Sequence, residues 1–88
     1  MFRLWAKELQ DNHLLRDTVV VMKGTQSRTK KVLGALEQVC VEFDLQVPIW
    51  LDSNIREFQR RAKTRFSQDN FVESIPFDYL EIHVIEED

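Results

Sequence analysis

Two alternating stretches at the ends of the chain constrain its fold more than any other feature. Apolar and polar residues alternate over residues 2–9 and again over 77–86, and a period of two is typical of a β-strand with one buried face. Residues 14–22 are also predicted to form a strand. The sequence Gln10-Asp11-Asn12-His13 before them is predicted to form a turn, because Asp and Asn accept a left-handed backbone. The chain is therefore expected to begin with a β-hairpin and to end with a strand.

Two helices and a further strand are expected between these ends. Apolar residues of 27–43 fall within about a third of a helical wheel, which predicts the first helix. The sequence Val47-Pro48-Ile49-Trp50-Leu51 is a candidate for a short buried strand, restricted by its proline to a strand start or an edge. Asn54 and Glu57 have the spacing of a capping box, and a second helix is predicted from there to about Lys63.

These elements predict an α+β fold: a two-layer sandwich with a mixed sheet of about four strands and two helices, in the order ββαβαβ. A right-handed crossover would make the second and third strands parallel. The β-branched run Val19-Val20-Val21 favours a central position for the second strand. With 88 residues, the chain is expected to form a single domain over residues 1–88.

The sequence contains no recognisable catalytic motif. Gly24 and Gly34 are its only glycines, so a glycine-rich phosphate loop is not expected. The single cysteine, Cys40, lies in the apolar phase of the first predicted helix, where a thiol behaves as a small hydrophobe. No apolar run approaches the ~18 residues that span a bilayer, and charges interrupt residues 1–8 where a signal peptide needs apolar residues. We therefore expect no enzyme, no cofactor, no small-molecule substrate and no membrane contact.

The two histidines allow two interpretations. His13 and His83 could form a metal site completed by one or more acidic residues, for which the candidates are Asp11, Asp78 and Glu81. They could equally be ordinary surface histidines, one in a turn and one on the polar side of a strand. We favour the second interpretation and predict no metal site.

The two tryptophans differ in their neighbours. Trp50 lies between Ile49 and Leu51, which favours a core position. Trp5 lies on the opposite side of its strand from Phe2 and Leu4, so it should reach the uncovered face of the sheet, near Tyr79 and His83. There it could stack on RNA bases or lie flat beneath lysine and arginine stems, and we favour the latter.

Charged residues are segregated along the chain. The net charge is −3, yet residues 23–31 hold four cations and no acid, and residues 69–88 hold seven acids and no lysine or arginine. A second basic run over 56–65 has Glu57 as its single acid. Its arginines stand late in the second predicted helix, where they complement the helix dipole, and Glu57 is spaced to pair with Arg61.

The first basic run breaks the dipole rule, because its cations crowd the positive start of a helix. Such a start offers free backbone amides and cations to an anion. The predicted anion- or partner-binding residues are Lys23, Arg28, Lys30 and Lys31, and the predicted secondary basic face comprises Arg56, Arg60 and Lys63. Alternatively, the acidic C-terminal segment packs nearby and neutralises the first run, and we favour that alternative.

Five strings of the sequence resemble a group of small uncharacterised bacterial proteins of about this length. The strings are Arg16-Asp17-Thr18-Val19-Val20, Glu42-Phe43-Asp44-Leu45, Pro48-Ile49-Trp50-Leu51-Asp52, Lys63-Thr64-Arg65-Phe66 and Phe77-Asp78-Tyr79-Leu80-Glu81-Ile82. The resemblance covers essentially the whole chain. It implies a bacterial cytoplasmic source, and it carries no activity, cofactor or site residue.

These observations predict a non-enzymatic protein-interaction module with segregated basic and acidic surfaces. Its partner would be another protein, not identified by the sequence, or a second copy of the chain. The alternative is an RNA- or ribosome-associated domain that uses the basic runs at 23–31 and 56–65.

Overall fold

The structure is a computed structural model that describes residues 1–87, so Asp88 of the acidic C-terminal run, the last position of the predicted single domain, lies outside the described residues. The N-terminal hairpin forms as predicted, with β1 at Phe2–Gln10 and β2 at His13–Met22. Asp11 and Asn12 connect the strands with φ angles of 51° and 63°. Two successive left-handed residues give the tight turn whose twist matches a hairpin.

Helix α1 spans Arg28–Phe43 and confirms the first predicted helix. Ser27 is its N-cap, and the Ser27 hydroxyl accepts a hydrogen bond from the backbone amide of Lys30 at 3.3 Å. The helix ends at Asp44, which adopts a left-handed conformation with φ 55°. Most of the apolar stripe that the wheel predicts is buried against the sheet, namely Val32, Leu36, Val39, Cys40 and Phe43. Leu33, also on the predicted stripe, is 44% exposed, and Ala35 is buried in addition.

Helix α2 spans Asp52–Arg61, and the short strand β3 follows it at Lys63–Phe66. The predicted strand over 47–51 is wrong, because this segment joins the two helices without pairing to any strand. Pro48 is buried and Ile49 exposed, so the alternation is present although the ladder is absent. A 3₁₀ turn, η1, covers Gln68–Asn70, and β4 spans Tyr79–Glu86, where the final strand was predicted.

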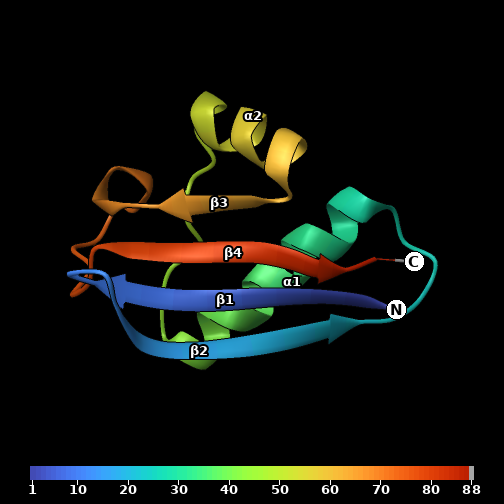
Figure 1. Cartoon of the computed structure of the whole chain (residues 1–88), viewed down its shortest axis with the longest axis horizontal. Coiled ribbons are helices and arrows are strands. Elements are labelled where there is room, and N and C mark those ends of the chain that lie inside the picture. The colour runs from blue at the N-terminus through green and yellow to red at the C-terminus, as the bar shows by residue number, and fades with distance from the viewer. Residues whose placement is uncertain (88) are drawn as a thin grey trace.

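Within residues 1–87 the four strands form one sheet in the order β2-β1-β4-β3, and every neighbouring pair is antiparallel (Figure 1). The α+β class with four strands and two helices is confirmed. The mixed sheet and the order ββαβαβ are wrong, since α1 and α2 follow each other with no strand between them, and β2 and β3 lie at opposite edges of an antiparallel sheet instead of forming a parallel pair. The predicted central position of β2 is also wrong: β2 is an edge strand that pairs only with β1 among the described strands. Val19 and Val21 face solvent, and of this run only Val20 is buried.

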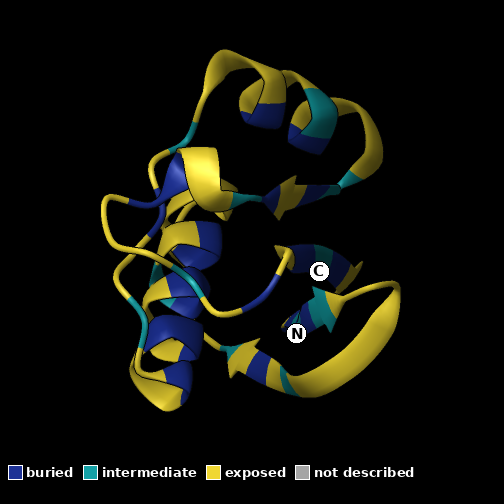
Figure 2. Cartoon of the chain, turned by 90° about the vertical axis from the view of Figure 1, so that its left-hand side faces the viewer, coloured by how far each residue is buried: buried dark blue, intermediate teal, exposed yellow. Residues whose placement is uncertain are grey.

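Figure 2 shows α1 against one face of the sheet, while α2 lies beside β3. The covered face carries the largest fully buried side chains, among them Phe2, Leu4, Phe66, Leu80 and Ile82. The opposite face has no helix over it among residues 1–87 (Figure 2). The molecule therefore presents two kinds of surface. One is the open face of the sheet. The other comprises the outer side of α2 and the end of the molecule where α1 and α2 expose cations.

Candidate interaction surfaces

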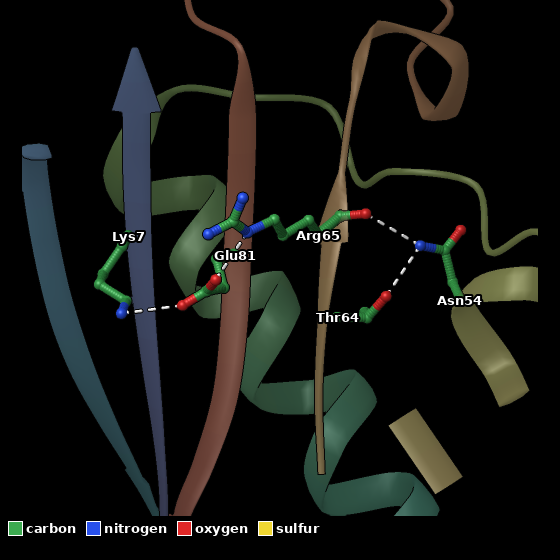
Figure 3. Close-up of polar contacts among 5 residues, drawn as sticks. All are labelled: Lys7, Asn54, Thr64, Arg65 and Glu81. Atoms are coloured by element: carbon green, nitrogen blue, oxygen red, sulfur yellow. Dashed lines mark hydrogen bonds and ion pairs between the residues drawn. The ribbon is translucent and has the colours of Figure 1, made fainter. Parts of the chain in front are cut away.

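A buried asparagine fixes the position of α2. Asn54 is 6% exposed, and its Oδ1 accepts a hydrogen bond from the backbone amide of Leu51, the residue that precedes the helix, at 3.1 Å. Its Nδ2 donates to the Thr64 hydroxyl at 2.9 Å and to the Arg65 carbonyl at 3.0 Å (Figure 3). The predicted capping box of Asn54 with Glu57 is wrong, because the helix begins at Asp52 and Asn54 already occupies its third position.

A second asparagine extends this network into the segment before β4. Asn70 is 3% exposed, and its Nδ2 donates to Asn54 Oδ1 at 2.7 Å and to the Ile49 carbonyl at 2.7 Å. Its Oδ1 accepts from the Ser67 amide at 2.9 Å. Every amide group of the two side chains has a partner, which is the condition under which buried polar groups stabilise and specify a fold. The start of α2 is thereby tied to β3 and η1.

The outer side of α2 and the first residue of β3 carry four cations that have no acidic partner within the described residues. We call Arg56, Arg60, Arg61 and Lys63 the α2 basic surface. Their side chains form no ion pair and no hydrogen bond with any residue of 1–87. The predicted pairing of Glu57 with Arg61 is therefore not made, although the two residues line the same clefts.

Two shallow clefts run along this surface and share Glu57 and Arg61 in their linings. One, of about 270 Å³, is lined by Ser53, Arg56, Glu57, Arg60 and Arg61. The other, of about 260 Å³, is lined by Glu57, Arg61, Lys63, Thr64, Arg65 and Glu81. Because the linings overlap, the two clefts adjoin each other; we call them together the furrow, which reaches from α2 to β3. No aromatic side chain lines the furrow within the described residues.

The cations predicted around the start of α1 are placed differently from one another. Lys23 and Lys30 are exposed, whereas Lys31 is buried at 9% exposure. Arg28 forms an ion pair with Glu87, and its guanidinium also lies 5.3 Å from the centre of the Phe58 ring. The acidic C-terminal segment thus reaches this cluster, and it offsets part of its charge. No acidic residue occupies the first turn of α1, as predicted.

An open cavity of about 350 Å³ separates α1 from α2. Arg28 lies at its lining together with Val32, Leu33, Trp50, Ile55 and Phe58. Trp50 is half-buried and packs edge-on against Phe58 at 5.4 Å and Phe66 at 5.0 Å, measured between ring centres. The predicted core position of Trp50 is confirmed. Its Nε1 is buried and finds no acceptor in the part of the chain that the structure describes.

Trp5 lies on the open face of the sheet, opposite His83 of β4, as predicted. Its Nε1 donates a hydrogen bond to the Asp17 carboxylate at 2.8 Å. The Lys7 ammonium lies over the indole ring, 4.1 Å from its centre. The ring is therefore engaged by a lysine and an aspartate of its own sheet, in line with the favoured interpretation that it lies beneath cationic side chains.

A carboxylate in the middle of the open face joins two strands to β4. Glu81 is 7% exposed, and its two oxygens bind Lys7 Nζ and Arg65 Nε, each at 2.8 Å (Figure 3). Burial alone would raise the pKa of the Glu81 carboxyl, but the hydrogen bonds and charges of Lys7 and Arg65 outweigh it and lower the pKa. Glu81 therefore stays ionised at neutral pH and holds β1, β4 and β3 together across the face.

The remaining candidates are dispersed. His13 is exposed at the start of β2, and His83 is half-buried in β4. Residues 1–87 contain no group of three His, Cys, Asp or Glu side chains placed to hold a metal ion. Cys40 is buried in α1, and burial, aided by the charge of Glu37, raises its thiol pKa to about 11.

Sequence reasoning missed the residues that position α2. Asn54 was interpreted only as a cap, and Thr64 and Asn70 were given no role. The partners that join these residues to other elements lie 10 to 21 residues away, so no local pattern reports those contacts. Of these residues, only Thr64 has a local signal of its burial. It lies between Lys63 and Arg65 in a strand, so its side chain points to the opposite side from these two cations.

No helix among the described residues is long and apolar enough to cross a membrane. Comparison of the chain with models of known protein families, with curated proteins and with solved structures found no match.

Proposed function

We propose that this protein is a non-enzymatic interaction module of the bacterial cytoplasm, and that it docks an acidic surface of a partner protein on the α2 basic surface. The observation that carries this proposal is the absence of ion pairs at Arg56, Arg60, Arg61 and Lys63 with any residue of 1–87. Four neighbouring cations repel one another unless an anion lies between them. A partner carboxylate entering the furrow would supply that anion.

Helix stability accounts for only part of this charge. Arg60 and Arg61 occupy the last turn of α2, where they complement the helix dipole. Arg56 stands a turn earlier, and Lys63 lies beyond the helix, at the first position of β3. Neither of these two gains from the helix end. The arrangement instead resembles the charged patches that steer protein partners and fix their orientation.

The α2 basic surface rests on a rigid support. Phe58 anchors the inner side of the helix at 5% exposure, and Asn54 fixes its first turn to β3. Binding groups on such a fixed element lose little freedom when a partner docks. The exposed ends of the arginine side chains are then the main parts that need to be ordered.

An acidic protein fits this surface better than RNA does. Proteins that bind single-stranded RNA stack bases on aromatic rings, yet no aromatic side chain lines the furrow within residues 1–87. Trp5, the aromatic candidate for stacking, is already covered by Lys7. RNA binding through the same cations is the alternative function.

A binding experiment with two probes separates these functions. A fluorescently labelled peptide of glutamate residues and a labelled uridine oligonucleotide are titrated with the protein, and anisotropy is followed at low and moderate salt. We expect the peptide to bind, with an affinity that falls as salt increases. Preferential binding of the oligonucleotide would support the RNA alternative, and no binding of either probe at low salt would contradict both.

Two charge reversals locate the binding surface. Arg60→Glu removes a cation from the α2 basic surface and should weaken peptide binding at least about tenfold. Lys30→Glu makes the same change in net charge at the start of α1 and is the matched control, which should bind within about twofold of the original. Equal losses in both variants would show that only the overall charge matters, and this result would contradict a docking site on α2.

A further inference from the structure

The outer edge of β2 is the least protected part of the fold. β2 is ten residues long and pairs with β1 on one side. On its other side no strand pairs with it within residues 1–87. An edge strand presents a row of unpaired backbone N–H and C=O groups, and natural proteins usually guard such edges with prolines, charges or covering elements.

The usual guards are missing from β2. The strand contains neither proline nor glycine, and its two charged side chains make contacts within the same chain. Arg16 binds both oxygens of Glu8, at 2.8 and 3.0 Å, and the carbonyl of Phe43 at 2.8 Å. Asp17 accepts the hydrogen bond from Trp5. The charges that could repel an approaching strand are therefore already engaged.

Beyond Asp17, the exposed side chains of β2 are apolar. Val19 is 46% exposed and Val21 41% exposed, both on the open face of the sheet. The register of β2 on β1 is regular from Arg16 to Met22, and the irregularity lies at the other end of the pair, between Glu8 and Leu9. A β-branched and apolar edge with a regular register favours the addition of another strand.

We propose that the strand added here is β2 of a second copy, paired antiparallel about a two-fold axis through Val20. The edge is self-complementary in this register, which is what a two-fold interface requires. Val19 of each copy lies opposite Val21 of the other. Asp17 of each copy lies opposite Lys23 of the other, on the same face, and Lys23 has no ion pair within the described residues. Other registers, such as one that places Asp17 opposite Asp17, bring like charges together or leave Asp17 against a valine.

The dimer would leave both α2 basic surfaces free. β2 and β3 are the opposite edges of the sheet (Figure 1), and α2 lies beside β3. Joining two copies through β2 gives one continuous sheet with a copy of α2 at each far end. This proposal stands independently of the proposed function, but the two together would make a bivalent module, which gains avidity for a partner with repeated acidic segments.

Sedimentation velocity of the full chain, over micromolar to millimolar concentrations, tests the dimer. We expect a reversible monomer–dimer equilibrium. Val21→Lys places a charge on the edge of each copy and should raise the dimer dissociation constant at least about tenfold. Val72→Lys makes the same substitution between η1 and β4, at a residue that is 80% exposed, and this matched control should dimerise as the original does.

A third variant keeps the test decisive if Val21→Lys unfolds, as checked by circular dichroism. Lys23→Glu lies just beyond the strand and places two acids opposite each other in the proposed register, so it should also weaken the dimer. A strict monomer at all concentrations would overturn the proposal. So would a dimer that is unaffected by Lys23→Glu, or one that Val72→Lys disrupts equally. None of these outcomes depends on the binding of an acidic peptide.

Discussion

Asn70 donates a hydrogen bond of 2.7 Å to Asn54 in the interior of the protein, across 16 positions of the sequence. The bond joins the first turn of α2 to the turn before Phe71. Through the other partners of Asn54 it reaches Thr64 and the Arg65 carbonyl of β3. The α2 basic surface therefore depends on a polar network that lies beneath it.

Asn54→Ala should destabilise the protein by about 2–3 kcal/mol, because it leaves buried donors and acceptors without partners. Urea unfolding followed by tryptophan fluorescence measures this loss. Gln59→Ala is the control on the same helix, since Gln59 is exposed and its side chain forms no hydrogen bond within residues 1–87; it should change the free energy of unfolding by less than about 0.5 kcal/mol. Equal effects of the two substitutions would contradict the role of the network.

Glu81 makes the stability of the fold depend on pH in the acidic range. Its folded-state pKa lies below the ordinary value of 4.5, because Lys7 and Arg65 outweigh the effect of burial. The unfolded chain therefore binds the proton more readily, and the stabilisation present above about pH 4.5 is lost as the pH falls through the folded pKa.

Glu81→Gln should lower the free energy of unfolding near neutral pH by about 2 kcal/mol, since two charge-assisted hydrogen bonds are lost. It should also flatten the dependence of stability on pH below about 4.5. Urea unfolding of both proteins along a pH series measures the effect. Glu86→Gln, which removes half of an exposed ion pair with Arg3, is the control and should leave the acid dependence nearly unchanged.

Lys30→Glu should stabilise the protein even though it removes a candidate binding residue. Lys30 lies in the first turn of α1, where no acid is present, and an acidic residue there gains about 0.3–1 kcal/mol from the helix dipole. Thermal unfolding at low salt would show the rise in melting temperature, and high salt should reduce it. A lower melting temperature would mean that Lys30 makes a stabilising contact that its exposure does not indicate.

Cys40 should be unreactive in the folded protein. Its thiol is buried, and the raised pKa of about 11 leaves almost no thiolate near neutral pH. Labelling with a disulfide reagent at mildly alkaline pH should therefore proceed only in denaturant. Rapid labelling of the native protein would show that α1 opens from the sheet.

Most of the regular elements could be predicted because each has a strong pattern of its own. The alternation in β1 and β4, the left-handed turn at Asp11-Asn12 and the apolar stripe of α1 are local features. The errors arose where the local sequence pattern does not show which strand or turn a segment pairs with. The Pro48–Trp50 stretch alternates as a strand does, yet its Ile49 amide bonds to the Asn70 carbonyl of a distant turn, and β3 is only four residues long within a basic run.

The candidate surfaces were predictable in composition but not in pairing. The sequence indicates that Arg28 and Arg61 are cations in basic runs. It does not show that Arg28 meets Glu87 while Arg61 misses Glu57, because both outcomes depend on where the chain brings side chains together. The three-dimensional pairing therefore moves the favoured binding surface from the start of α1 to the outer side of α2.

The central claim is that α2 presents the docking surface, and amide chemical-shift mapping tests it most directly. Uniformly ¹⁵N-labelled protein is titrated with the unlabelled glutamate peptide at low salt, and the shifts of all assigned amides are followed. We predict that the largest shifts fall on residues 56–63, with little change at residues 28–31. Shifts concentrated at the start of α1, or spread evenly over every cation of the molecule, would contradict the claim.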